Sequence, residues 1–372
     1  MRVDAFHYTL PAELIAQHPP DDREAARMMI LPRDGGPIEH RSVAELAGLV
    51  PEGALVVVND TRVIPARLVG RKRDSGGRVE VLLVRCLGVR EIEVAPGHVR
   101  DVVIWRALGK ASRALRFQSD IVVHAHGDDS GSPRLVLRLL GRAGDDGLLE
   151  VAVYSPCGEP VLSALHACGH VPLPPYIKRS DAPQDVSRYQ TVYARHDGAV
   201  AAPTAGFHLT HALLGRLAVH GCEVTAITLH VGLGTFQPVV ADDFDLHRMH
   251  AERVVVSQST VDAVAKARSK GAAVVAIGTT TVRALESAAD EDNPGHVRSI
   301  DTDTQLLIQP GYRWRVVDAL LTNFHLPRSS LLALTCAFGG TERVLEAYGC
   351  AVRERYRFYS YGDAMFLWRL PT

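Results

Sequence analysis

The chain has 372 residues, of which 47% are hydrophobic and 22% charged, with 41 basic against 42 acidic side chains. This composition excludes a disordered or fibrous chain, and the length favours two domains or one large one. A net charge of −1 gives no overall field that attracts nucleic acid, so an RNA partner would have to meet a local basic patch.

The sequence shows no sign of a membrane or an oxidising compartment. No apolar run reaches the roughly 18 residues that a membrane span needs, and the first residues lack the basic-then-apolar pattern of a signal peptide. The six cysteines form no CxxC pair, so we expect core residues rather than metal ligands or disulfides. We therefore expect a cytoplasmic protein.

The first 65 residues read as α/β. A short helix is predicted over 11–17, buried strands over 28–31 and 54–58, and a helix over 43–49. From about 66 to 157 the pattern changes to short β-type runs separated by Gly, Asp and Ser turns, which predicts a small barrel or sandwich. Its expected strands are 79–84, 121–126, 135–140 and 149–154.

After residue 157, apolar strands and helices alternate, which is typical of a largely parallel sheet with helices on its faces. The expected strands are 223–230, 272–277 and 316–321, and the expected helices are 260–270, 281–289 and 329–338. We predict a large mixed α/β domain built from both chain ends, residues 1–65 and 158–372, with an inserted small β-barrel domain, residues 66–157.

Polar clusters follow the apolar strands at four places. Ligands of open α/β sheets bind outside the carboxyl ends of the strands, so these clusters predict a cleft. Each cluster could instead be a structural turn or helix cap. The GxG motif formed by Gly232 and Gly234 is by itself weak evidence for nucleotide binding. The clusters contain Asn59, Asp60 and Thr61; His230, Gly232, Gly234 and Thr235; Gly278, Thr279 and Thr280; and Asn323 and His325.

Three further segments have open interpretations. The run 247–252 contains His247, His250 and Glu252, which suit a metal site, an acid–base pair or structural hydrogen bonds. The small residues of 198–207 lead to His208 and form either a ligand-approaching loop or a tight packing loop. Arginines alternate with aromatic residues over 355–363, which suits stacking on unpaired bases or an aromatic strand in a core.

Together these segments resemble the S-adenosylmethionine:tRNA ribosyltransferase-isomerase family of queuosine biosynthesis over nearly the whole chain. The matching motifs are FHYTLPAELIAQ at 6–17, NDTRVIPARL at 59–68, GGRVEVLL at 76–83, PLPPYI at 172–177, YQTVYA at 189–194, and the stretches 198–210, 230–239, 247–252, 278–287, 318–332 and 356–365. Residues 88–150 match worst.

The resemblance implies a large α/β domain with an inserted β-barrel, which agrees with the patterns above. It also implies transfer of the ribosyl part of S-adenosylmethionine to 7-aminomethyl-7-deazaguanine at the wobble position of tRNA. The product is epoxyqueuosine, and adenine and methionine leave. S-adenosylmethionine is then a consumed cosubstrate, with no metal and no permanently bound cofactor, and tRNA is the partner of a monomeric enzyme.

On this resemblance we assign candidate roles and expect one shared pocket that contains Asn59, His208, His250 and Thr279. The acid–base candidates are His208, His230, His250 and Glu252, with Asp60 and Asp363 orienting groups or holding cations. Cosubstrate contacts are expected from Asn59, Thr61, Thr204, Gly232, Gly234, Thr235, Gly278, Thr279, Thr280, Arg283, Asn323 and His325, with Arg283 and the helix start at 278–280 on the methionine carboxylate. A basic rim for tRNA is expected from Arg67, Arg71, Lys72, Arg73, Arg355 and Arg357.

Three alternatives remain open at this point. One is a metal hydrolase built on His247, His250 and Glu252. Another is an RNA-binding module that kept the scaffold and lost the chemistry. The third is a relative that uses S-adenosylmethionine on another acceptor.

Overall fold

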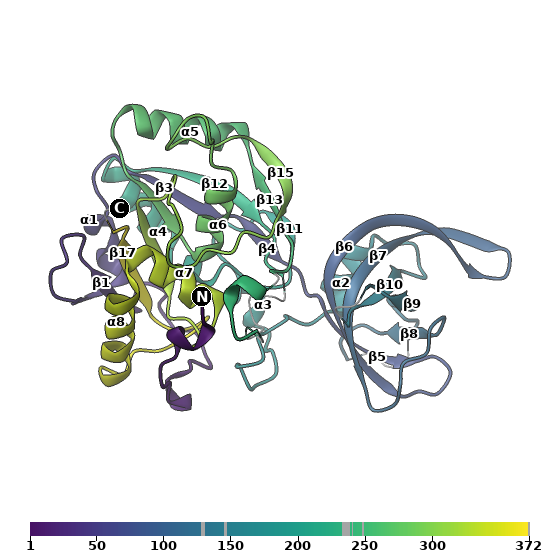
Figure 1. Ribbon diagram of the computed structural model, residues 1–372. Helices are drawn as coiled ribbons and strands as arrows, with labels where there is room; N and C mark the ends of the chain where they lie inside the picture. Colours follow the sequence, from purple (N-terminus) through teal and green to yellow (C-terminus); the bar gives the residue numbers. More distant parts are fainter. Residues whose placement is uncertain (128–130, 145–146, 233–238, 240, 248, 371–372) are drawn as a thin grey trace.

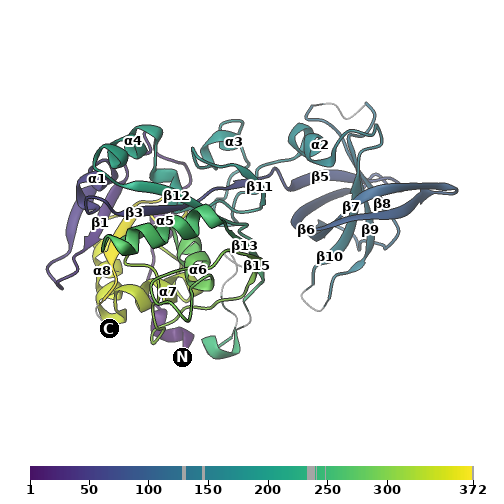
Figure 2. The ribbon, with the colours of Figure 1, turned by 90° about the horizontal axis from the view of Figure 1, so that it is seen from above.

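The chain forms a large lobe, which holds both termini, and a small lobe joined to it by extended segments (Figures 1 and 2). This computed structural model describes residues 1–127, 131–144, 147–232, 239, 241–247 and 249–370. No helix within those ranges combines the length and the apolar character that crossing a bilayer requires.

The large lobe is built on a mixed sheet that has nine strands in the described part of the chain, in the order β15-β13-β12-β3-β14-β16-β17-β1-β2. Strands β12, β3, β14 and β16 run parallel, whereas β13 and β17 are antiparallel to their neighbours β12 and β16. In sheet order the strands are β15 (Ile300–Thr304), β13 (Glu252–Val256), β12 (Glu223–Leu229), β3 (Leu55–Asn59), β14 (Val274–Ile277), β16 (Ala319–Asn323), β17 (Ala364–Trp368), β1 (Arg27–Leu31) and β2 (Glu39–Ser42).

Helices cover both faces of this sheet, so its central strands are apolar on both sides. In β3, Leu55 and Val57 face one core while Val56 and Val58 face the other. The first core includes α5 (Gln258–Ser269), α6 (Thr279–Ser287), α7 (Ser330–Gly339) and α8 (Thr341–Arg353); the second includes α1 (Leu46–Leu49) and α4 (His211–Val219). Side-chain caps from Thr210, Ser257 and Ser329 begin α4, α5 and α7.

Short elements complete the large lobe. Strands β4 (Thr61–Val63) and β11 (His196–Ala199) form a separate parallel pair next to the extended connection between the lobes. The remaining pieces are α3 (Asp185–Arg188) and the 3₁₀ turns η1 (Val3–Phe6), η2 (Ala12–Leu14), η3 (Val43–Glu45), η4 (Thr204–His208) and η6 (Phe244–Leu246).

The small lobe is an antiparallel sheet, with six strands among the described residues, in the order β10-β7-β6-β5-β8-β9. Strand β9 also pairs with β10, so the strand order closes on itself around an apolar core. The strands are β5 (Arg67–Lys72), β6 (Arg78–Ala95), β7 (His98–Ala111), β8 (Asp120–Val123), β9 (Leu135–Arg142) and β10 (Leu149–Tyr154).

Helix α2 (Val161–Cys168) packs on this antiparallel sheet rather than on the main sheet. Its apolar side, Ala164, Leu165 and Cys168, is buried in the core of the small lobe, and Figures 1 and 2 show the helix on that lobe. The sequence interpretation assigns these residues to the large domain, because the short β-type runs end at about residue 157 and a pattern of alternating strands and helices follows.

The mixed α/β class with a separate antiparallel sheet is confirmed, and the local differences have physical causes. Strands β5 and β7 were not predicted, because exposed charged residues interrupt their apolar patterns. The expected helix over 11–17 is only the turn η2, since Ile15 already has extended backbone angles. Residues 355–363 are not a terminal strand; β17 begins at Ala364.

Candidate functional site

Several strands of the main sheet present polar residues at one edge. Strands β3, β14 and β16 are parallel and end there at Asn59, Ile277 and Asn323. Because β13 and β17 run the opposite way, their first residues, Glu252 and Ala364, lie at the same edge. The predicted strand-end clusters therefore do meet in space.

Asn59 links three elements at this edge. Its Nδ2 donates to the Leu229 carbonyl at 3.0 Å and to Thr280 Oγ1 at 3.3 Å. Its Oδ1 accepts from the backbone N–H of Leu229 and of Thr61. The side chain is fully buried. The hydrogen-bonding groups of Asn59 join β3, β12 and α6 in this structure, and its expected cosubstrate contact stays a prediction.

The start of α6 opens onto a cavity at the strand ends, here named the strand-end cavity. Gly278 adopts φ +93°, a left-handed conformation that lets the chain turn sharply from β14 into the helix. Thr279 and Thr280 follow in the first turn, where backbone N–H groups have no partner within the helix. The other walls are 202–205, 322–326, Val231, Ser329, Leu331, Tyr176, Tyr359 and Ser360.

Asn323 and Thr204 line this cavity, and Asn323 also joins His208, which lies behind them and does not line it. Its Nδ2 donates to His208 Nε2 at 3.1 Å, and its Oδ1 accepts from Thr204 Oγ1 at 3.0 Å. Since the amide nitrogen is only a donor, Nε2 of His208 is an acceptor and the imidazole is neutral. Next to Asn323, His325 Nε2 bonds to Thr322 Oγ1 at 2.8 Å.

Two buried histidines near Asn323, His208 and His325, are uncharged at neutral pH. Burial lowers the pKa of His208 to about 4, and the charges of Arg357 and Arg23 act in the same direction. Burial lowers the pKa of His325 to about 3. Neither imidazole therefore adds positive charge to the strand-end cavity at pH 7.

These histidines should make the protein less stable in mild acid. In the unfolded chain both bind a proton below about pH 6.5, whereas the folded chain binds none until about pH 4, so the free energy of unfolding falls as the pH drops between these values. The expected loss is about 1.4 kcal/mol per pH unit for each histidine. Urea unfolding at pH 7, 6 and 5 should show a shallower pH dependence in His325→Gln than in the wild type. The exposed control His211→Gln should match the wild type, and equal slopes in all three proteins would contradict the prediction.

A second cavity, the junction cavity, lies between the lobes. Its walls include Arg85 and Arg106 from the small lobe and His230, His250 and Glu252 from the large lobe. Val231 lines both cavities, so they adjoin. The residues expected in one pocket are thus divided between two adjoining cavities, and Asn59 and His208 line neither of them. Thr279 and Asn323 line the strand-end cavity, whereas His230, His250 and Gly232 line the junction cavity.

His230 is fixed in orientation by its neighbours. Its Nδ1 bonds to Thr61 Oγ1 at 2.7 Å, and a Cβ on Gly198 would lie only 2.9 Å from the ring. Burial lowers the pKa of His230, and the charges of His196 and Arg253 lower it further. The predicted residue Thr61 therefore positions an imidazole and lines neither cavity.

Glu252 and Arg283 pair with each other in the interior. Their side chains are each 4% exposed, and Arg283 Nη1 donates to Glu252 Oε2. Glu252 Oε1 accepts from the Gly232 N–H at 2.9 Å, and Arg283 Nε donates to the Leu306 carbonyl at 3.0 Å. Each charge neutralises the other, so in this arrangement Arg283 is bound to Glu252, whereas its contact with a methionine carboxylate and the acid–base role of Glu252 stay predictions.

The two predicted aspartates are engaged in orienting contacts. Asp60 accepts from Thr228 Oγ1 at 2.6 Å and lies 3.6 Å from His196 Nε2. The carboxylate of Asp363 accepts from the backbone N–H groups of Arg27 and Arg357 at 3.1 and 2.8 Å. Both carboxylates are almost completely buried.

Two of the predicted contact residues and the metal-hydrolase alternative remain to be compared with the structure. Gly234 and Thr235 lie outside the described residues. Across the described ranges, no three His, Cys, Asp or Glu side chains are arranged to hold a metal ion. The metal-hydrolase alternative thus has no ligand set in this part of the chain.

The expected basic rim is partly neutralised within the protein. Arg67 Nε bonds to Glu80 at 2.8 Å, and its Nη1 lies 3.4 Å from Asp181. Lys72 donates to two backbone carbonyls of the small lobe, whereas Arg71 and Arg73 are exposed. Arg67 is therefore a connection between the lobes rather than a free phosphate contact.

The aromatic residues near the C-terminus pack inside the protein. Tyr356, Phe358, Tyr359 and Tyr361 are at most 6% exposed, whereas Arg355 lies on the surface. These rings are buried and therefore cannot stack on RNA bases as one interpretation of the sequence suggests. The alternating pattern places the aromatic side chains in the core and the arginines toward the surface.

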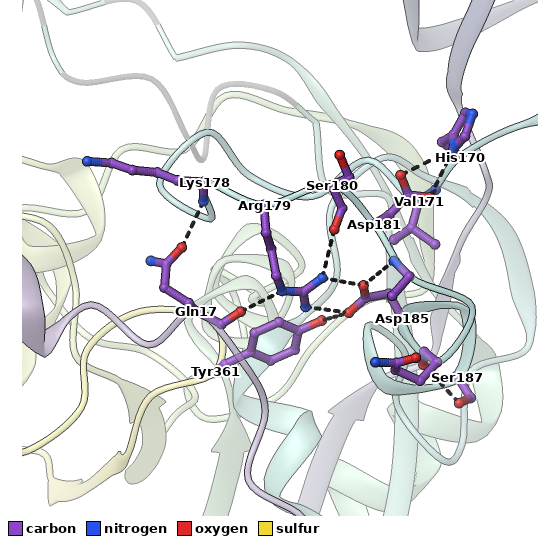
Figure 3. Close-up of polar contacts among 12 residues, drawn as sticks. Gln17, His170, Val171, Lys178, Arg179, Ser180, Asp181, Asp185, Ser187 and Tyr361 are labelled. Atoms are coloured by element: carbon purple, nitrogen blue, oxygen red, sulfur yellow. Dashed lines mark hydrogen bonds and ion pairs between the residues drawn. The ribbon is translucent and has the colours of Figure 1, made fainter.

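The chain that returns from the small lobe is tied to both ends of the sequence (Figure 3). Arg179 bonds to both carboxylate oxygens of Asp185 at 2.6 and 2.8 Å, and Tyr361 donates to the same carboxylate at 2.9 Å. Arg179 also donates to the Gln17 carbonyl at 2.9 Å. Burial alone would raise the pKa of Asp185, but these hydrogen bonds lower it. The network fixes the segment that carries Tyr176 beside the strand-end cavity.

Sequence reasoning missed most of the wall residues of the strand-end cavity, among them Tyr176, Tyr359, Ser360 and Ser329. Tyr176 belongs to the motif PLPPYI, and Tyr359 and Ser360 belong to the aromatic cluster. The motifs were therefore noticed, but a sequence pattern does not show which aromatic ring reaches a cavity.

The fold and the two adjoining cavities define an α/β enzyme with a polar cleft at the carboxyl edge of its sheet and an antiparallel lobe beside that cleft. Residues 3–367 match the family model described as queuosine biosynthesis protein. The chain belongs to this queuosine biosynthesis family.

Individual relatives match over nearly their full length. The protein named S-adenosylmethionine:tRNA ribosyltransferase-isomerase in Sorangium cellulosum is 52% identical over 99% of this chain and 98% of its own. The protein of the same name in Anaeromyxobacter is 48% identical, with 99% of each chain covered. A crystal structure of the S-adenosylmethionine tRNA ribosyltransferase of Thermotoga maritima is 32% identical with a TM-score of 0.52, covering 98% of this chain and 99% of that one.

Proposed function

We propose that this protein is an S-adenosylmethionine:tRNA ribosyltransferase-isomerase that makes epoxyqueuosine in tRNA. It transfers the ribosyl part of S-adenosylmethionine to the amine of 7-aminomethyl-7-deazaguanine at the wobble position and isomerises it to an epoxycyclopentanediol. Adenine and methionine are the leaving products. Full-length similarity to proteins of this name supports the activity. The structural observation that supports this function is that the strand-end cavity adjoins the junction cavity at Val231, so two substrates could meet there.

S-adenosylmethionine occupies the strand-end cavity in this proposal. The first turn of α6 offers backbone N–H groups and the positive end of the helix dipole to the methionine carboxylate. Asn323 and Thr204 present an amide and a hydroxyl on the facing wall. This assignment replaces the expected guanidinium contact of Arg283 with backbone N–H groups alone.

The acceptor base enters through the junction cavity. The sulfonium of S-adenosylmethionine acidifies the neighbouring 5′-carbon, so a base that removes this proton starts the rearrangement. The acceptor amine must also be neutral to attack. Burial favours the neutral form of His230, and in this proposal its Nδ1–H donates to Thr61 Oγ1, so that Nε2 is free of hydrogen and can take a proton. His250 lies at the same cavity.

The test of this function is incubation with S-adenosylmethionine and an anticodon stem-loop carrying 7-aminomethyl-7-deazaguanine. Adenine release and a nucleoside of the mass of epoxyqueuosine are expected. The same stem-loop with guanine at the wobble position is the control and should give neither product. Adenine release without any change in the RNA would reject the proposed acceptor.

The small lobe acts in this proposal as an inserted β-barrel domain that docks RNA. Its boundaries are about residues 66 and 169, because α2 packs with it. Arg85 and Arg106 of this lobe and Arg253 of the large lobe line the junction cavity and are the candidate phosphate contacts. Arg85 and Arg253 are ion-paired with Asp303 and Asp301, but they are 39% and 51% exposed, against 29% for Arg67, so that a phosphate can reach them more easily. The enzyme is further proposed to be a cytoplasmic monomer that needs no permanently bound cofactor.

Binding of the stem-loop should weaken as salt is added, because phosphate contacts release counterions. Arg85→Ala with Arg106→Ala should reduce the slope of log affinity against log salt by about 1 to 2 units. Arg41→Ala, on the edge strand β2 far along the main sheet, is the control and should keep the wild-type slope. An unchanged slope in the double variant would exclude these arginines as phosphate contacts.

A further inference from the structure

Among the described residues, the lining of the strand-end cavity includes no carboxylate that could neutralise a bound cation. None of the described residues that line it is an Asp, Glu, Lys or Arg. Burial keeps its histidine, His325, neutral by lowering the pKa to about 3. S-adenosylmethionine nevertheless carries a permanent positive charge on sulfur, and a cation in such a site requires either a carboxylate or an aromatic face.

Two tyrosine rings form one wall of this cavity. The ring centroids of Tyr176 and Tyr359 lie 4.6 Å apart with the planes inclined at 46°. The Tyr176 hydroxyl bonds to Ser360 Oγ at 2.6 Å, and its carbonyl accepts from Gln17 Nε2 at 2.9 Å. The two rings are therefore fixed from different parts of the chain.

The backbone of Tyr359 is strained in order to hold its ring there. Its φ is +70°, a conformation that bulky L-residues rarely adopt and that occurs most often at functional sites. The strain is maintained by hydrogen bonds from its N–H to the Phe324 carbonyl and from the Gly362 N–H to its own carbonyl. In the described residues, arginines lie over the rings of Phe207, Tyr356, Trp368 and Tyr154, and none lies over Tyr359.

We propose that Tyr176 and Tyr359 are the sulfonium subsite, which selects the charged cosubstrate over its neutral thioether analogue. This inference rests on the proposed placement of S-adenosylmethionine in the strand-end cavity. The π faces of the two rings attract the positive sulfur, while the first turn of α6 binds the carboxylate at the other side of the same cavity. When the C5′–S bond breaks, the sulfonium becomes the neutral thioether of methionine, which has no such attraction, and this favours the release of methionine.

The test compares the affinity of S-adenosylmethionine with that of S-adenosylhomocysteine by calorimetry on the full-length protein. Wild type should bind the sulfonium about tenfold more tightly than the thioether. Tyr359→Leu should weaken S-adenosylmethionine about tenfold and leave S-adenosylhomocysteine within about twofold, whereas Tyr359→Phe should keep the wild-type ratio. Tyr176→Leu should change the two affinities in the same way as Tyr359→Leu, so that the test can still be made if one of the two variants does not fold. Tyr312→Leu, a half-buried tyrosine away from the cavity, is the matched control.

The outcomes separate this inference from the function on which it rests. Equal weakening of both ligands in Tyr359→Leu and Tyr176→Leu, or no weakening, overturns the sulfonium subsite. If Asn323→Ala still weakens both ligands, the placement of the cosubstrate stands without that subsite. If Asn323→Ala changes neither affinity, the cosubstrate does not occupy the strand-end cavity, and both the placement and the subsite are rejected.

Discussion

Replacing Asn323 by alanine is expected to lower the rate of adenine release about 100-fold. The substitution removes the donor to His208 Nε2 and the acceptor for Thr204 Oγ1, so a buried imidazole nitrogen and a half-buried hydroxyl lose their partner. Each unpaired group costs about 1–3 kcal/mol, and each 1.4 kcal/mol in the barrier is tenfold in rate. The measurement is single-turnover release of adenine from S-adenosylmethionine in the presence of the precursor stem-loop.

The matched control for this prediction is Asn293→Ala, which removes the same side chain from an exposed loop. It should release adenine at the wild-type rate. Thermal melting of both variants separates a catalytic effect from unfolding. A folded Asn323→Ala protein with a near-normal rate would show that this hydrogen-bonded wall takes no part in the reaction.

Replacing Glu252 by glutamine is expected to destabilise the large lobe by about 3–5 kcal/mol. Glutamine keeps the shape and can still accept from the Gly232 N–H, but it leaves the Arg283 guanidinium buried without its counter-charge. An uncompensated buried charge is costly because the interior cannot replace the lost hydration. Urea unfolding followed by tryptophan fluorescence measures the change.

Arg253 and Asp301 provide the comparison, since they form an ion pair 2.9 Å long at the surface with both side chains more than half exposed. Asp301→Asn should change the free energy of unfolding by no more than about 1 kcal/mol. If Glu252→Gln costs no more than Asp301→Asn, the buried pair is not important for stability.

The sequence predicts the large lobe well, because its strands are short, apolar and separated by helices with clear caps. The runs at 54–58 and 272–277 coincide with the central strands β3 and β14, and the run at 28–31 coincides with β1, next to the edge strand β2. The small lobe is harder, because one face of each strand carries charged residues. Arg67 to Lys72 reads as a basic surface segment, although alternate side chains of β5 are buried in the core.

The candidate site shows a similar limit. Polar residues at strand ends correctly indicate the edge at which the cavities lie. Their individual roles depend on side-chain direction, which sequence spacing does not give. Asn59 and Thr279 follow equally apolar strands, yet Asn59 links backbones inside the protein whereas Thr279 lines a cavity. Arg283 looked available for an anion because its partner, Glu252, is 31 residues away in the chain.

Strand β3 is translated early, but the two strands that flank it, β12 and β14, begin more than 160 residues later. The nascent polypeptide on the ribosome therefore exposes the fully apolar segment Leu55–Val58 while the whole small lobe is being made. The small lobe, whose strands are contiguous in the chain, is able to fold during that interval, and the large lobe completes its sheet only near the end of synthesis. Chaperone dependence during expression is accordingly expected to reside in the first 65 residues, and circular permutants that start at the small lobe should depend less on chaperones.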